Sequence, residues 1–289
     1  MGDYIVSTTS TADLTVEFCS DHGVDINYLT FTIDGVDYKD DVNESMSYEE
    51  FYSGMRNGRM SSTSACNIEQ ATEFFEKYAR EGIDVLHISF SSGLSSTYNN
   101  EYIAAQDVMD RYPDRSIIVI DSLCASRGQG LLVYYAVMMK ERGCTINEVS
   151  EWVENNKLHL CHQFTVDDLH HLHRGGRVSK TVAVVGTIVN VKPVLHVDNE
   201  GRLIPLKNVR GRKKSLITLV DNMLEQIDGY DNEMIYIGHG DCLEDAEFVK
   251  ELVIDKTGIR NVEIGYVGSV IGSHSGPGTV ALFFLGNER

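Results

Sequence analysis

Apolar and polar residues alternate in blocks along the first half of the chain, in the order expected of strands and helices. Residues 85–89 and 117–120 are short runs rich in Val, Ile and Leu, which is typical of strands buried on both faces. The apolar residues of segment 68–78 recur at intervals of three and four, which indicates a helix with one buried face. This alternation predicts a mostly parallel sheet with helices on both sides.

The same periodicities predict the other elements of this half. Strands are expected at residues 4–6, 27–33, 36–38, 85–89 and 117–120. Helices are expected to begin at residues 47 and 67 and to span 13–23, 99–109, 128–142 and 146–155. The dipeptide Asp34-Gly35 favours a hairpin turn between the second and third strands.

The pattern changes after residue 164. Two strands flank a polar turn, and helices and strands then alternate: strands at 192–197 and 202–209, a helix at 215–227, a strand at 234–238, a helix at 243–252, and strands at 261–266 and 279–285. This order predicts an α+β arrangement. We therefore expect an α/β protein of two domains, residues 1–164 and 165–289.

Hydroxyl side chains gather where three strands of the first half end, in residues 7–11, 91–97 and 121–122. In open α/β sheets these strand ends border a crevice that binds ligands, so we expect the three loops to line one site. A further hydroxyl cluster, residues 61–64, precedes a helix, and capping of that helix is its simplest explanation.

The loop at residues 91–97 holds one glycine among five hydroxyls. A serine nucleophile needs Gly-x-Ser-x-Gly, and Thr97 stands where the second glycine belongs. A phosphate needs several glycines and a cation, which the loop lacks. A carboxylate needs only two or three neutral donors near a helix start, and the loop has them. A hydrolase or esterase with Ser95, Asp121 and His274 in that chain order stays as the alternative.

His274 lies in a segment, residues 267–278, that contains four glycines and a proline. Such a composition predicts a rigid loop that lets the backbone approach a neighbour closely. A histidine held in that loop can donate a hydrogen bond to an anion or act as a base.

Charge limits the partners of the protein. The chain has 25 Lys and Arg and 43 Asp and Glu, a formal charge of −18, which repels nucleic acid and anionic lipid head groups. We find neither a signal segment nor an apolar stretch long enough to span a membrane. We therefore expect a cytoplasmic protein that binds no nucleic acid and does not insert stably into membranes. The six separated cysteines indicate small buried side chains or unused thiols.

Two other clusters of polar residues suggest chemistry. The run Arg210-Gly211-Arg212-Lys213-Lys214 precedes an expected helix, where cations oppose the helix dipole, so it suggests contact with a phosphate group or an acidic partner. A group of possible metal ligands lacks the spaced pairs of zinc sites, and a surface or interface role is favoured for it. Its members are His159, Cys161, His162, His170, His171 and His173.

Several motifs follow one another over nearly the whole chain. They are Ser10-Thr11-Ala12-Asp13-Leu14, Thr63-Ser64, the run from Ser91 to Tyr98, Leu172 with Gly175-Gly176-Arg177, Lys192-Pro193, the run from Arg210 to Lys214, and Gly272 to Gly278. Their order and spacing resemble those of the DegV-type fatty-acid-binding proteins, the lipid-carrying subunits of bacterial fatty acid kinase.

The resemblance implies that one long-chain fatty acid is buried between the two domains. Its carboxylate would be held by Thr63 and Ser95, with His274 in the same hydrogen-bond network. Additional ligand contacts would come from Ser64, Ser92, Ser96 and Gly272. Apolar stretches at residues 131–139, 182–191 and 283–284 offer a lining for the acyl chain or ordinary core.

The resemblance also implies a partner. A separate kinase subunit would use ATP and Mg²⁺ to convert the carboxylate to an acyl phosphate, for phospholipid synthesis or another use, and Arg210 and Arg212 would contact that subunit. The protein itself would be a binding and presenting subunit without a cofactor or metal, and not an enzyme.

Three departures from the family pattern concern the loops. Thr9-Ser10 stands where Asp-Ser is usual, Ala65-Cys66 where Gln-Pro is common, and Ser96 where glycine is frequent. The first two lie in loops expected to border the head group. They therefore bear on the identity of the ligand more than on the fold.

Overall fold

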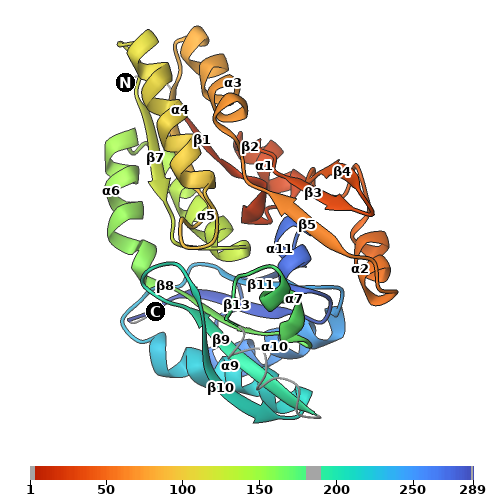
Figure 1. The fold of residues 1–289 in the computed structure, drawn as a ribbon. Helices are drawn as coiled ribbons and strands as arrows, with labels where there is room; N and C mark the ends of the chain where they lie inside the picture. The colour runs from red at the N-terminus through yellow and green to blue at the C-terminus, as the bar shows by residue number, and fades with distance from the viewer. Residues whose placement is uncertain (1–3, 180–189, 288) are drawn as a thin grey trace.

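A four-stranded parallel sheet forms the centre of the N-terminal half (Figure 1). The structure, a computed structural model, describes residues 4–179, 190–287 and 289. The strand order is β2-β1-β6-β7 and each pairing is parallel, as the sequence predicts. The strands are β1 (Tyr4–Thr9), β2 (Asp25–Asn27), β6 (Asp84–Ser89) and β7 (Ile117–Asp121).

Helices cover both faces of this sheet because successive strand residues point to opposite sides. Val85 packs into a core shared with α3 and α4, whereas its neighbour Leu86 packs into a core shared with α5 and α6. The helices of this half are α1 (Val16–His22), α2 (Tyr48–Arg56), α3 (Ile68–Glu81), α4 (Thr97–Arg111), α5 (Arg127–Glu141) and α6 (Ile146–Asn156). Two short 3₁₀ helices are η1 (Ser10–Ala12) and η2 (Lys157–His159).

A small antiparallel sheet, in the order β4-β3-β5, stands beside the parallel one. Its strands are β3 (Thr30–Ile33), β4 (Val36–Lys39) and β5 (Ser61–Ser64). The single strand expected at residues 27–33 is therefore wrong, because β2 and β3 belong to different sheets. The helix-cap explanation of residues 61–64 is also wrong: these residues form a strand, and the Asn67 side chain caps α3 by accepting a hydrogen bond from the Gln70 amide.

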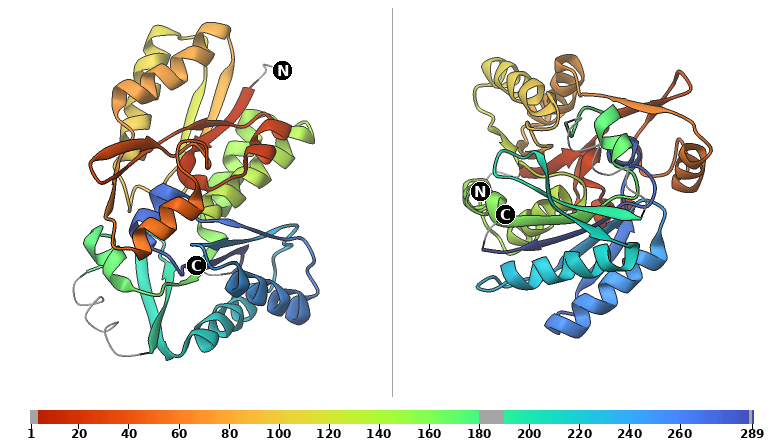
Figure 2. Two further views of the ribbon diagram at one scale, coloured as in Figure 1. Left: turned by 90° about the vertical axis from the view of Figure 1, so that its right-hand side faces the viewer. Right: turned by 60° about the horizontal axis from the view of Figure 1, so that its bottom comes forward.

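The C-terminal half is built on a six-stranded, mostly antiparallel sheet in the order β10-β9-β8-β13-β11-β12. Its strands are β8 (Leu160–Thr165), β9 (Val191–Val197), β10 (Leu203–Arg210), β11 (Ile235–His239), β12 (Val262–Tyr266) and β13 (Val280–Leu285). Two long helices, α9 (Arg212–Gln226) and α10 (Leu243–Thr257), cover one face (Figure 2). The predicted α+β architecture is confirmed.

Helix α5 contacts both sheets: β1 and β6 of the parallel sheet, and β8, β11 and β13 of the six-stranded sheet. Most of its side chains are buried, which is why its sequence lacks a polar face. The domain boundary expected between residues 164 and 165 falls inside β8, a central strand of the six-stranded sheet.

Two short helices, α7 (Leu169–Arg174) and α11 (Ser269–Ser275), pack against each other. The rigid loop expected at residues 267–278 is therefore wrong over the span of α11. Gly272 suggests a loop in the sequence, but it lies within the helix. Glycine is needed at this position because an added Cβ would lie 2.5 Å from the Tyr52 hydroxyl. No helix in the described part of the chain is long and apolar enough to cross a membrane.

Candidate functional site

A cavity of about 170 Å³ lies where the two halves of the chain meet. A cavity that holds one water molecule needs only about 10–15 Å³, so this one admits a much larger ligand. Its apolar walls are formed by Leu29, Ala65, Phe90, Leu94, Ala125, Phe164, Leu172, Val197, Leu203, Val267, Val270, Ile271, Ala281 and Phe283.

Five of the seven residues expected to touch a ligand line this cavity: Thr63, Ser64, Ser95, Ser96 and His274. Two do not line it. Ser92 is exposed, and its amide donates a hydrogen bond to Asp121 Oδ1. Gly272 is buried against Tyr52.

Among the described residues of the apolar stretches considered as a lining, only Phe283 reaches the cavity. Residues 131–139 belong largely to the core around α5, and Phe284 to the core under α9 and α10. Residues 182–189 lie outside the described part of the chain.

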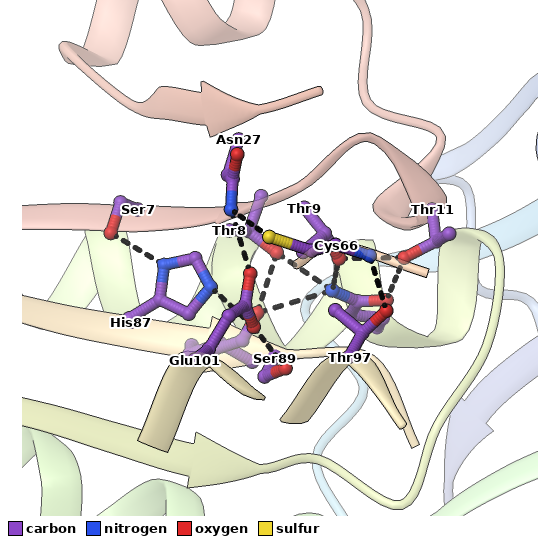
Figure 3. Close-up of polar contacts among 12 residues, drawn as sticks. Ser7, Thr8, Thr9, Thr11, Asn27, Cys66, His87, Ser89, Thr97 and Glu101 are labelled. Carbon is purple, nitrogen blue, oxygen red and sulfur yellow. Dashed lines mark hydrogen bonds and ion pairs between the residues drawn. The ribbon is translucent and has the colours of Figure 1, made fainter. Parts of the chain in front are cut away.

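Only one of the three strand-end loops expected to share a site reaches the cavity, the loop after β6. In the first loop, Gln129 donates hydrogen bonds to the Thr8 and Thr9 hydroxyls and accepts one from Thr11 (Figure 3). In the third, the Ser122 hydroxyl accepts a hydrogen bond from the Cys124 amide. These hydroxyls stabilise buried turns of their own, so the expectation of one shared crevice is wrong for both loops.

The loop after β6 places Ser95 just before α4. The Ser95 Oγ accepts a hydrogen bond from the Thr97 amide at 3.2 Å and lies 2.9 Å from Thr97 Oγ1. Ser96, the residue at the cap position, makes no side-chain hydrogen bond to the helix. Ser95 and Ser96 both line the cavity.

Gly93 has a packing role in this loop. An added Cβ would lie 2.4 Å from the Glu200 carbonyl oxygen, in the turn between β9 and β10. The Ser91 hydroxyl donates to the neighbouring Gly201 carbonyl. The glycine lets the two halves of the chain touch, which accounts for its place in the loop without a phosphate or a nucleophile.

Thr63, on β5, and His274, on α11, contact each other in the wall of the cavity. The Thr63 Oγ1 lies 2.8 Å from His274 Nε2, whereas the buried Nδ1 has no hydrogen-bond partner among the described residues. Burial, and then the nearby Arg177, lower the pKa of His274 to about 4, so the ring is neutral at pH 7. Because a buried N–H is costly to leave unpaired, the single proton belongs on Nε2. Thr63 then accepts from His274 and can donate its own proton to the cavity.

Arg177 is a site residue that the sequence does not mark as a ligand contact. It lines the cavity, its Nε donates to the Leu94 carbonyl at 3.2 Å, and its Nη1 donates to the Gly175 carbonyl. Burial lowers its pKa, and it forms no ion pair with any acidic side chain that the structure describes. The signal in the sequence was an arginine directly after a glycine pair. Arg177 lies 83 residues from Leu94 in the sequence, so only the fold shows that the two residues are in contact.

The alternative triad is not assembled. Ser95 Oγ bonds within its own loop, His274 bonds to Thr63, and Asp121 Oδ1 accepts from the amides of Ser92 and Leu123. A serine nucleophile requires a histidine within hydrogen-bond reach, oriented by the acid. The geometry therefore disfavours a hydrolase that uses these three residues.

The two arginines expected to meet a partner differ in their surroundings. Arg210 is exposed at the end of β10. Arg212, the first residue of α9, pairs with Asp245 at 2.7 Å and lies 3.7 Å from Asp167. Neither lines the cavity. Arg210 is thus the more accessible of the two.

The histidine and cysteine cluster considered for a metal is dispersed in the fold. His159 contacts the Gly286 carbonyl, His162 contacts the Leu160 carbonyl and the Ala125 amide, and His171 contacts Arg174. Burial lowers the pKa of His162 well below its usual value. Within the described ranges, no group of three or more metal-binding side chains comes together.

Comparison with known proteins identifies the family. The model of the DegV family ("Uncharacterised protein, DegV family") matches residues 5–287. A DegV domain-containing protein of Clostridium perfringens is 43% identical over 291 residues, which cover 100% of this chain and 99% of the relative.

Solved structures share the fold. A DegV family protein from Thermus thermophilus, described as fatty acid binding, is 27% identical with a TM-score of 0.87, and the match covers 99% of this chain and 100% of the other. A DegV lipid-binding protein from Thermotoga maritima is 28% identical with a TM-score of 0.85, and the match covers 99% of each. From the match over nearly its entire length, the chain belongs to the DegV family.

Proposed function

We propose that this protein binds one long-chain fatty acid in the cavity, with the carboxylate held by the hydroxyls of Thr63 and Ser95. The observation that carries the proposal is that Thr63, Ser95 and His274 line one largely apolar cavity, with Thr63 hydrogen-bonded to His274. The fatty acid binding described for the Thermus thermophilus relative supports the same ligand class.

The physical chemistry of the cavity favours an acid with a long tail. Each buried methylene contributes about 0.8 kcal/mol, so a long chain supplies most of the affinity. The head group then needs donors rather than a paired cation. Arg177 adds positive potential beside the hydroxyls, while its hydrogen bonds to two carbonyls hold it in place.

Native mass spectrometry of the purified protein tests the proposal. We expect a co-purifying mass that matches a C16 to C18 acid. After delipidation, the double variant Thr63→Ala with Ser95→Ala should bind palmitate about ten- to hundredfold more weakly, since hydrogen bonds to a charged group are lost. Ser62→Ala and Ser92→Ala, exposed neighbours outside the cavity, serve as matched controls. Wild-type protein that binds no fatty acid would contradict the proposal.

We further propose that the bound acid is presented to a separate fatty acid kinase, which supplies ATP and Mg²⁺ and forms the acyl phosphate. On this view the protein is a binding subunit of the cytoplasm, and its product serves lipid synthesis. The exposed Arg210, on a chain of charge −18, offers a local positive contact. Because it lies outside the cavity, it is free to act on a partner without touching the ligand.

The variant Arg210→Ala separates the two roles. We expect its palmitate affinity to stay within about twofold of wild type, while acyl phosphate formation with the cognate kinase falls at least about tenfold. Arg202→Ala removes another exposed arginine, from the turn at the opposite end of β10, and is the control. Equal kinase rates for Arg210→Ala and wild type would rule out this contact.

A further inference from the structure

Thr97 lies two residues after Ser95 and, unlike Ser95, does not line the cavity. It is the first residue of α4, and its side chain is fully buried. Its hydroxyl has two neighbours among the described residues: the Cys66 amide, which donates to Oγ1 at 3.2 Å, and Ser95 Oγ at 2.9 Å. The Cys66 amide can only donate, so one acceptor position of Thr97 is occupied in every arrangement.

The Cys66 peptide is held in place from both sides. Asn100 donates to the Cys66 carbonyl at 2.7 Å. Asn27 donates to the Cys66 sulfur and to Glu101 (Figure 3). Thr97, Asn100 and Glu101 share one face of α4, since they are spaced three and four residues apart. The amide that contacts Thr97 therefore has little freedom to turn away.

The direction of the hydrogen bond between Thr97 and Ser95 depends on which hydroxyl proton would otherwise lack an acceptor. If Ser95 donated, the proton of Thr97 would be left in the core without an acceptor. The cost of an unpaired buried donor disfavours this arrangement by about tenfold or more. Thr97 therefore donates and Ser95 accepts.

Ser95 also accepts the hydrogen bond from the Thr97 amide. Both acceptor positions of its oxygen are then occupied, and its own proton points elsewhere. Because Ser95 lines the cavity, the proton is available to a ligand there. Ser95 thus faces the ligand as a donor only.

We propose that Thr97 is a positioning residue that orients the Ser95 hydroxyl toward the cavity and so selects head groups that accept hydrogen bonds. The inference rests on the proposed role of Ser95. A carboxylate has only acceptors and fits such a donor. The hydroxyl of a fatty alcohol can accept from Ser95 but must find a separate acceptor for its own proton. Thr97 therefore favours acids over alcohols of equal chain length.

The test compares the affinities of delipidated protein for palmitate and for hexadecanol. The variant Thr97→Val keeps the shape and the backbone amide but removes the hydroxyl, so Ser95 can either donate or accept. We expect palmitate affinity to fall about five- to tenfold and hexadecanol affinity to change by less than about twofold. Thr97→Ser, which restores the hydroxyl, should recover the wild-type preference.

Thr218→Val is the matched control, because Thr218 is also a buried threonine in a helix, α9, but lies away from the cavity. If Thr97→Val does not fold, Thr97→Ala carries the same prediction, and circular dichroism reports folding for each variant. An unchanged ratio of the two affinities in a folded variant without the Thr97 hydroxyl would overturn the inference while leaving the proposed function intact. Wild-type protein that fails to bind palmitate would overturn both.

Discussion

Burial decides the charge of single side chains around the site. His274 is kept neutral because burial, and then the nearby Arg177, lower its pKa to about 4. Asp40, behind the cavity wall, is affected in the opposite way: burial raises its pKa to about 6. These two residues give the stability of the protein opposite dependences on pH.

The lowered pKa of His274 predicts a loss of stability in acid. Below about pH 6.5 the unfolded chain takes up a proton on this ring, and the folded protein does not until about pH 4. The free energy of unfolding should therefore fall by up to about 3 kcal/mol between these pH values. In His274→Gln, thermal melts should show a smaller decrease over this interval. An identical pH profile for the variant and wild type would contradict the assigned environment.

The raised pKa of Asp40 predicts a loss of stability as the pH rises from about 4 to about 6. The unfolded carboxyl ionises near pH 4, and the folded one only near pH 6, so stability is lost as the pH rises through this range. Asp40→Asn cannot ionise and can still accept the hydrogen bond from the Ser269 amide. Its melting temperature relative to wild type should be higher at pH 8 than at pH 4. A constant difference across this range would show that Asp40 is not responsible.

At the scale of helices and strands, close contacts at glycine positions shape the cavity. Gly93 meets the turn between β9 and β10, and Gly175 lies against His274, where an added Cβ would be 2.1 Å from Nδ1. Gly93 joins segments from different halves of the chain, whereas Gly175 joins α7 to α11 within the C-terminal half. A side chain at either position would displace a wall of the cavity.

The variant Gly93→Ala tests this packing. Its Cβ would meet the backbone of Glu200 at 2.4 Å and of Gly201 at 2.9 Å, so the turn must move. We expect a loss of about 1–3 kcal/mol in the free energy of unfolding, with weaker palmitate binding, in denaturant titrations and binding assays. Gly54→Ala is the control, because its Cβ meets only the flexible side chain of Arg59. Gly93→Ala with the stability and affinity of wild type would exclude the close contact.

The elements that the sequence predicts well are those with strong periodicity of their own. The strand at Ile117–Asp121 and the helix at Ile68–Glu81 show their buried faces directly. The strand at Ser61–Ser64 has no apolar pattern, and it is a strand because it pairs with Thr30–Ile33. The sequence of α11 does not show a helical pattern, because close neighbours require glycine within the helix and at its ends. Such elements are determined by tertiary contacts, which a local pattern does not contain.

At the scale of the whole molecule, the cavity is made by both halves of the chain together. Leu29, Ser95, Leu172 and Phe283, which lie far apart in the sequence, share its lining. The hydroxyls of the site could be proposed from sequence motifs, because each stands in a short characteristic run. The place of Arg177 and the acceptor role proposed for Ser95 toward Thr97 could not, because the first depends on the contact of Arg177 with Leu94 and the second on the contact of Thr97 with the Cys66 amide.

The central claim is that the cavity holds a fatty acid with its carboxylate at Thr63 and Ser95. A crystal structure with a C16 acid that carries bromine on its terminal carbon tests it most directly, since anomalous scattering locates the tail. We predict carboxylate oxygens about 2.5–3.2 Å from Ser95 Oγ and Thr63 Oγ1, and bromine among the apolar walls. A carboxylate bound away from both hydroxyls, or a chain in the reverse direction, would contradict the account.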